Sequence, residues 1–211
     1  MQTPYTTPPL ARAPRRRSAV LTLALCAGLS ALPWLPLAAH AAAGTDAAPS
    51  PEVLQRSLQG RWTGALQYRD YQSNSPFELP VVTQFSAAPD GVTLTRLSAF
   101  DDGPKTGTVY ITTVSLFDAK TGQVMTATFR KGRAVEVWTD AVRNTAYRDA
   151  EHWTLVYAQR GSDNDKPADI RVTETRDGDS LLSLKEVKPA GAPDSAWAFR
   201  NQTRLQRQPA P

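Results

Sequence analysis

The chain is poor in cysteine and histidine: its 211 residues include one cysteine, Cys26, and two histidines, His40 and His152. A single cysteine excludes an intrachain disulfide, and these three side chains are too few for a structural zinc site. No G-x-S-x-G sequence supplies a nucleophilic serine elbow. We therefore predict a domain that is stabilised by its hydrophobic core alone and that has no catalytic residue, no metal and no cofactor.

Acidic residues are absent from the first 41 positions, which have the pattern of a secretory signal. Four arginines (Arg12, Arg15, Arg16 and Arg17) precede an apolar run over 19–37, and Ala39-His40-Ala41 supplies the small residues that a signal peptidase reads. A membrane anchor is the alternative, but a spanning helix needs about 20 apolar residues, and Pro33 and Pro36 interrupt this run. We expect cleavage after Ala41, export to the periplasm or beyond, and no transmembrane anchor in the mature chain.

Excess charge is also missing once this segment is removed. The whole chain has 24 Lys and Arg against 20 Asp and Glu, and four of the arginines lie in 1–41, so the mature chain has 20 of each. Binding to nucleic acid draws on a basic excess that releases counterions from phosphate. The sequence therefore predicts no nucleic-acid partner.

The mature chain reads as a flexible leader over 42–49, one domain over 50–207 and a disordered tail over 208–211. Ser50-Pro51-Glu52 has the signals of a helix start: a capping hydroxyl, an early proline and an acid near the positive end. Leu54 and Leu58 lie four residues apart and share one face of this short helix. We expect that face to plug or flank a larger element.

From Arg61 onward, apolar residues recur at every second position, which predicts short strands. Turn sequences such as Pro89-Asp90-Gly91 separate the strands at hairpin spacing. A turn or two of helix is expected over Asp140–Glu151, and no segment can serve as the crossover helix of a parallel sheet. The predicted fold class is all-β: an antiparallel up-and-down β-barrel of roughly 8–10 strands with a short N-terminal helix.

The start of the first strand resembles a known family. Its pattern is Gly60-x-Trp62-x-Gly64-x-x-x-Tyr68-x-Asp70-Tyr71. This pattern resembles the opening of lipocalin-type (calycin) barrels and of a group of exported bacterial proteins of uncharacterised function. The resemblance implies that Trp62 lies at the closed end of the barrel and that an arginine of the last strand, Arg200 or Arg204, packs across it. Arg204 is the expected partner because the last antiparallel strand ends where the first begins. The second lipocalin motif, T-D-Y, is absent.

Candidate binding residues come from the aromatic side chains of the strands. Tyr68, Tyr157 and Phe199 are the expected ligand contacts, and small inward residues are expected to leave space in the interior (Gly64, Thr113, Ser115 and Thr203). This pattern predicts an exported barrel that binds a small, largely apolar molecule. The alternative is a solidly packed structural or interaction barrel, and an exposed apolar patch together with a filled interior would favour it. An enzyme is third, and a buried Asp/Glu pair at the barrel mouth would favour it.

Other polar motifs have simpler interpretations. Asp101-Asp102-Gly103-Pro104 is expected to form a turn in which a carboxylate caps its own backbone. Asp163-Asn164-Asp165 lacks the glycine and the distal glutamate of a calcium-binding hand. His152 beside Glu151 is expected to be a surface residue. The sequence leaves the oligomeric state open.

Overall fold

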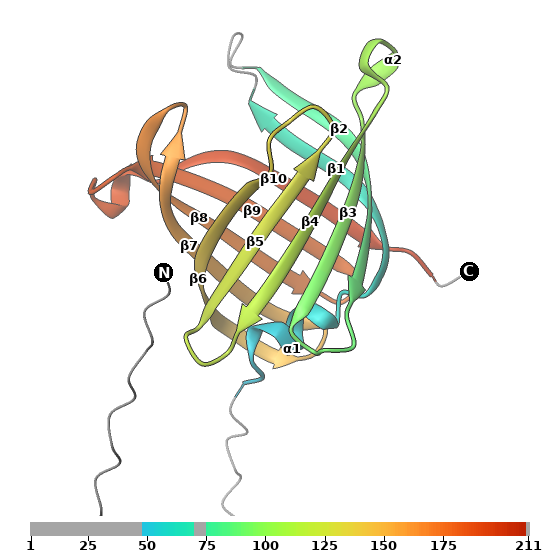
Figure 1. Cartoon of the computed structure of the whole chain (residues 1–211), viewed down its shortest axis with the longest axis vertical. Coiled ribbons are helices and arrows are strands. Elements are labelled where there is room, and N and C mark those ends of the chain that lie inside the picture. The colour runs from blue at the N-terminus through green and yellow to red at the C-terminus, as the bar shows by residue number, and fades with distance from the viewer. Residues whose placement is uncertain (1–47, 70–74, 210–211) are drawn as a thin grey trace, which may run out of the picture. The chain divides into compact units, whose positions relative to one another are not determined.

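Ten antiparallel strands form a closed barrel in the computed structural model, which describes residues 48–69 and 75–209 (Figure 1). The strand order around the barrel is β1-β10-β9-β8-β7-β6-β5-β4-β3-β2, so each strand pairs with its sequence neighbours and β10 closes on β1. The predicted up-and-down barrel is thus confirmed. The expected signal segment, 1–41, lies outside the described residues.

The strands are 8 to 14 residues long. Their bounds are β1 Gly60–Arg69, β2 Pro76–Ala87, β3 Thr93–Asp101, β4 Thr108–Asp118, β5 Gln123–Arg130, β6 Glu136–Asp149, β7 His152–Asp163, β8 Lys166–Asp177, β9 Ser180–Pro189 and β10 Ala198–Arg207. Three short helices accompany them: α1 Pro51–Arg56, α2 Gly103–Thr106 and the 3-10 helix η1 Asp194–Ala196.

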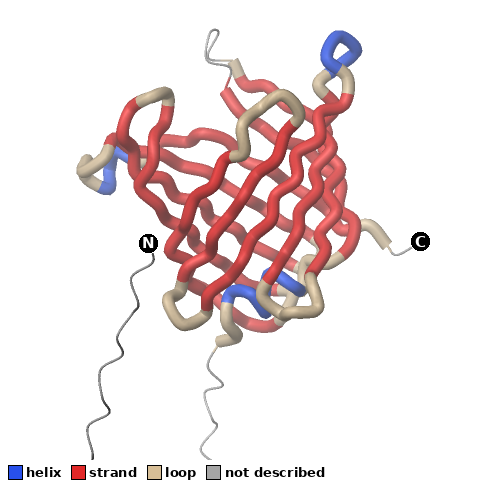
Figure 2. Tube along the Cα trace, in the orientation of Figure 1, coloured by secondary structure: helices blue, strands red, loops and turns tan. Residues whose placement is uncertain are grey.

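Helix α1 lies across one end of the barrel, opposite the end that carries α2 (Figure 2). Pro51 begins the helix as predicted, although the Ser50 hydroxyl bonds to the Glu52 carboxylate rather than to a backbone N–H. Leu54 and Leu58 are fully buried against the barrel core. The prediction that this face plugs a larger element is confirmed.

A hydrophobic cluster fills the end of the barrel that α1 covers. Trp62 and Phe85 are wholly buried and meet edge to face, with ring centroids 6.2 Å apart. Burying a large apolar side chain stabilises a fold by about 1.5–3 kcal/mol. The cluster is confined to this end because the inward side chains farther along the strands are polar, beginning with Arg96 on β3 and Glu174 on β8.

Strand β6 is longer than its sequence suggests. It continues through 140–149, where a turn or two of helix was expected, and bulges at Asn144/Ala146 and Tyr147/Asp149 let it stay paired with β7. The predicted Asp101–Pro104 turn is confirmed, since the Gly103 amide donates to Asp101 Oδ1 over 3.1 Å. No helix in the described part of the chain is long and apolar enough to span a membrane.

Candidate functional site

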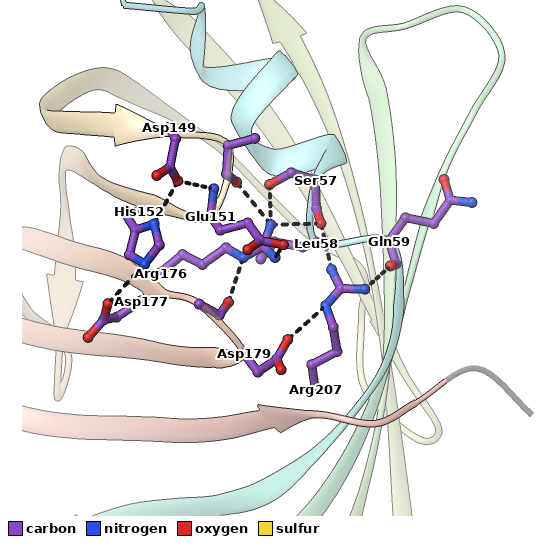
Figure 3. Close-up of polar contacts among 12 residues, drawn as sticks. Ser57, Leu58, Gln59, Asp149, Glu151, His152, Arg176, Asp177, Asp179 and Arg207 are labelled. Atoms are coloured by element: carbon purple, nitrogen blue, oxygen red, sulfur yellow. Dashed lines mark hydrogen bonds and ion pairs between the residues drawn. The ribbon is translucent and has the colours of Figure 1, made fainter.

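Two arginines fasten helix α1 to the closed end of the barrel (Figure 3). Arg176 donates to the Ser57 carbonyl and hydroxyl over 3.0 and 2.8 Å, and Arg207 donates to the same carbonyl over 2.6 Å. Trp62 Nε1 donates to the Leu58 carbonyl over 2.7 Å. The carbonyls that follow a helix end lack intrahelical partners. These bonds satisfy them and hold α1 in place as the floor of the interior.

The arginine that stacks on Trp62 is Arg207 and not the expected Arg204. The Arg207 guanidinium lies 4.8 Å from the Trp62 ring centroid, and these two residues are direct register partners between β1 and β10. Arg204 is exposed, because it lies three residues away along the strand and therefore points to the outside. Arg200, the other candidate, pairs instead with Asp163 over 2.9 Å.

Gly64 also has a different role from the expected one. A Cβ at this position would lie 1.9 Å from the Arg204 carbonyl oxygen. The glycine is therefore required by the close approach of β10 to β1, and it opens no interior space.

Beyond this floor the interior holds a cavity of about 300 Å³. This volume is at the lower end of the range for small-molecule sites. Apolar contacts come from Phe117, Ile170 and Val172, and the predicted small inward residues Thr113, Ser115 and Thr203 line it. A further interior space of about 60 Å³ adjoins the same Arg96, Glu174 and Ser183. The barrel is therefore not solidly packed.

A hydrogen-bonded network lies at the centre of the cavity. Arg96 Nη2 donates to Glu174 Oε1 over 2.7 Å, and Gln55 from α1 donates to Glu174 Oε2 and to the Tyr157 hydroxyl, the latter over 2.8 Å. Burial first, and then the Glu174 charge, raise the pKa of Tyr157 well above its usual value. The phenol therefore stays protonated and is available as a hydrogen-bonding group in the cavity.

A second pair of charges, Asp140 and Lys185, faces the same cavity. Asp140 is 8 % exposed and accepts a 2.9 Å hydrogen bond from Trp138 Nε1. Burial raises the pKa of Asp140, and Lys185 acts in the opposite sense without making an ion pair with it. Among the described residues, no hydrogen bond or ion pair engages the Lys185 ammonium group.

Of the three predicted ligand contacts, the structure places only Tyr157 on this cavity. Tyr68 lies farther along the barrel, with its ring 5.4 Å from the ring of the exposed Phe77. Phe199 is 40 % exposed because a bulge between Phe199 and Asn201 turns its side chain to the outside. A separate apolar hollow of about 110 Å³ lies beside Leu66 and Phe100.

The acidic pair that favours an enzyme is present in part. Asp140 and Glu174 are both buried and line one cavity, but each has its own donors, so they do not share a proton. His152 lies near the surface, 2.6 Å from Asp149, and it lowers the pKa of that carboxyl to about 2. In the described part of the chain, no cluster of three or more His, Cys, Asp or Glu residues has the geometry of a metal site.

An apolar patch covers the outside of four neighbouring strands. We call it the β3–β6 wall; its exposed members are Leu97, Tyr110, Leu116, Met125, Phe129 and Val137, together with Val135 in the connection just before β6. Register pairs place Leu97 and Phe129 on either side of Thr112, and Leu116 next to Met125. The outward positions of β4 from Thr108 to Leu116 carry no charge. The patch that favours an interaction protein is therefore present, although the filled interior is not.

No family model matches the chain, and no curated protein is similar to it. Among solved structures, the chain is similar to Rv2717c from M. tuberculosis, with a TM-score of 0.53 and 18 % identity over 76 % of this chain and 100 % of that one. A protein of unknown function from the DUF3598 family of Nostoc punctiforme aligns with a TM-score of 0.21 and 9 % identity, over 76 % of this chain and 100 % of that one. The first likeness supports the barrel fold.

Proposed function

We propose that this protein is an exported barrel that binds a small molecule in the cavity above α1. The observation that carries the proposal is an interior space of about 300 Å³ lined by a hydrogen-bonded ionic network around the buried Glu174. Replacing an ion pair in a protein interior with apolar residues is often neutral or stabilising, so a barrel that only needed stability is better served by apolar residues here. The polar lining favours a polar or amphipathic ligand over the largely apolar molecule expected from the aromatic residues.

A thermal-shift screen tests this proposal. Small-molecule extract from the native host is added to the purified mature protein, and the midpoint of unfolding is measured. A ligand at 100 times its Kd stabilises the fold by about 2.7 kcal/mol, which raises the midpoint by several degrees. The shift should shrink in Tyr157→Phe, which removes a cavity hydroxyl, and persist in Tyr68→Ala. No shift with any fraction, and no small molecule in protein taken from the host, would overturn the binding proposal.

Export is proposed on the sequence alone, from the arginines, the apolar run and Ala39-His40-Ala41. The mature N-terminus is expected at Ala42 or within a few residues of it. N-terminal sequencing of protein from the periplasmic and extracellular fractions measures this directly. Recovery of the intact chain from membranes would favour the anchor instead.

The β3–β6 wall supports a second candidate function, the pairing of two copies of this chain. Four strands at about 4.8 Å spacing and about nine residues of length give an area on the order of 500 Å², somewhat over half of the roughly 800 Å² that each partner buries in a stable interface. Because the outward positions of β4 carry no charge, two copies related by a two-fold axis meet there without like-charge repulsion.

Sedimentation velocity tests the pairing. The wild-type mature chain is expected to sediment as a dimer, and the double variant Met125→Lys/Phe129→Lys as a monomer. Gln206→Lys, on the opposite outer wall, is the matched control and should leave the dimer intact. A wild-type chain that stays monomeric at high micromolar concentration would contradict this candidate and leave the binding proposal untouched.

A further inference from the structure

Four charged side chains line the cavity, and they balance: Arg96 and Lys185 are cations, and Glu174 and Asp140 are carboxyl groups. Arg96 and Glu174 neutralise each other through a 2.7 Å ion pair. Lys185 and Asp140 influence each other electrostatically but form no ion pair. The cavity therefore contains one separated pair of opposite charges with open space beside it.

Their positions on the barrel explain the separation. Asp140 is on β6 and Lys185 is on β9, with β7 and β8 between them in the strand order. Lys185 is in register with Val172 on one side and Asn201 on the other, and both of these residues line the same cavity. The ammonium and carboxyl groups thus face the interior from different parts of the wall.

From this arrangement we propose that the ligand is a small zwitterion of the amino-acid class, with its carboxylate on Lys185 and its ammonium group on Asp140. The inference rests on the proposed binding function and specifies its ligand. A zwitterion supplies each of the two groups with an opposite charge and adds no net charge to the interior. A simple anion or a simple cation satisfies only one of them and leaves a net charge buried, which is costly.

The remaining groups fit this ligand class. The Tyr157 hydroxyl, the Asn201 amide and the Ser183 hydroxyl offer uncharged hydrogen bonds around the charged pair, and Ile170 and Val172 offer an apolar surface for a side chain. A cavity of about 300 Å³ suits a molecule at the small end of the range for bound ligands.

Isothermal titration calorimetry on the wild-type mature chain tests the inference. The first probes are the proteinogenic L-amino acids. For each amino acid that binds, two analogues are then measured: the matched primary amine, which lacks the carboxylate, and the matched 2-hydroxy acid, which lacks the ammonium group. We expect at least one amino acid to bind and both of its analogues to bind at least about tenfold more weakly, which is the usual loss for one charge-assisted hydrogen bond.

Variants locate the two ends of the ligand. Lys185→Met should weaken binding of the amino acid at least about tenfold but leave binding of the matched amine unchanged. Asp140→Asn should likewise weaken binding of the amino acid at least about tenfold but leave binding of the 2-hydroxy acid unchanged. Lys120→Met, an exposed lysine on the β4–β5 turn, is the control and should bind as wild type. If Lys185→Met does not fold, the wild-type comparison of the three probes still decides.

The outcomes separate the two proposals. A host molecule that binds in the cavity while no amino acid does would overturn the zwitterion and keep the binding function. Equal affinity for an amino acid and its deaminated or decarboxylated analogue would also overturn the zwitterion. The absence of any bound or binding small molecule would overturn both.

Discussion

At the scale of single residues, the closed end of the barrel depends on one aromatic ring and two guanidinium groups. Trp62 is completely buried, Arg207 lies 4.8 Å from its ring centroid, and Arg176 lies 5.9 Å from it. Desolvation first, and then the nearby Arg207 charge, lower the pKa of Arg176. The two like charges are held close together because both donate to the Ser57 carbonyl just after the helix and because Glu151 and Asp179 lie beside them.

Replacing Trp62 with alanine should lower the free energy of unfolding by about 3–5 kcal/mol, the usual loss for a buried large aromatic residue. Arg207→Ala should lower it by about 1–3 kcal/mol, because the Ser57 and Gln59 carbonyls lose a donor. Arg204→Ala, three residues away on the outer face, should change it by less than about 0.5 kcal/mol. Urea denaturation of the three variants measures these differences. Equal effects of the two arginine variants would contradict the assigned closure.

Asp140 should make the empty barrel less stable as the pH rises. Its folded-state pKa is raised above the ordinary 3.8, chiefly by burial, so the folded chain holds this proton more tightly than the unfolded chain does. Stability due to this group is present below pH 3.8 and is lost as the pH rises through the raised pKa. A tenfold difference in proton affinity between the folded and unfolded chains corresponds to about 1.4 kcal/mol of stability.

Asp140→Asn keeps an acceptor for Trp138 and removes the charge. Without ligand, the variant should therefore be more stable than wild type at about pH 7, and the difference should disappear near the ordinary carboxyl pKa of about 4. Urea denaturation at several pH values across this interval follows the comparison. A variant less stable than wild type at neutral pH would mean that the carboxylate is stabilised in the empty cavity.

At the scale of elements, helix α1 has two roles. Its Leu54 joins the hydrophobic cluster, as does Leu58 just after the helix, and its Gln55 side chain reaches into the polar cavity to contact Tyr157 and Glu174. One short segment thus joins the floor to the binding site. A ligand that contacts the network is therefore expected to stabilise the helix as well.

The plug can be tested with neighbouring positions of the same helix. Leu54→Ala should lower the free energy of unfolding by about 2–5 kcal/mol, because it removes buried methyl groups and leaves a cavity. Val53→Ala is the matched control, since Val53 is 51 % exposed, and it should change stability by less than about 0.5 kcal/mol. Thermal unfolding by circular dichroism provides both values. A small effect at Leu54 would show that the helix is not part of the cooperative core.

The alternation of apolar and polar residues predicted the strands and the plugging helix, but it failed where bulges occur. A bulge shifts the inside and outside positions by one, and for this reason Phe199 was expected inside and lies outside. The same reason accounts for β6, whose 144–149 segment breaks the period of two while it remains paired with β7. Bulges leave no distinct mark in one sequence, so these errors were not avoidable from the pattern.

At the scale of the whole molecule, the binding site differs from the predicted one because its main groups are charged. Arg96, Asp140, Glu174 and Lys185 each occupy an inward position of a strand. Arg96, for example, lies between the inward residues Leu94 and Ser98. These charged residues at inward positions were a signal that the sequence offered. A charged residue in the inward phase of a predicted strand indicates a polar interior, whereas aromatic residues alone do not distinguish a core from a cavity.

The central claim is that this interior holds a small molecule, and native mass spectrometry of protein purified from its host tests it most directly. The mature wild-type chain should carry one additional small-molecule mass that is lost under denaturing conditions. Ser183→Leu, which places a larger side chain in the cavity, should fold and carry no additional small molecule. Arg204→Ala should carry the same additional small-molecule mass as the wild-type chain. A wild-type chain that shows only its own mass, or a Ser183→Leu chain that keeps the ligand, would contradict the account.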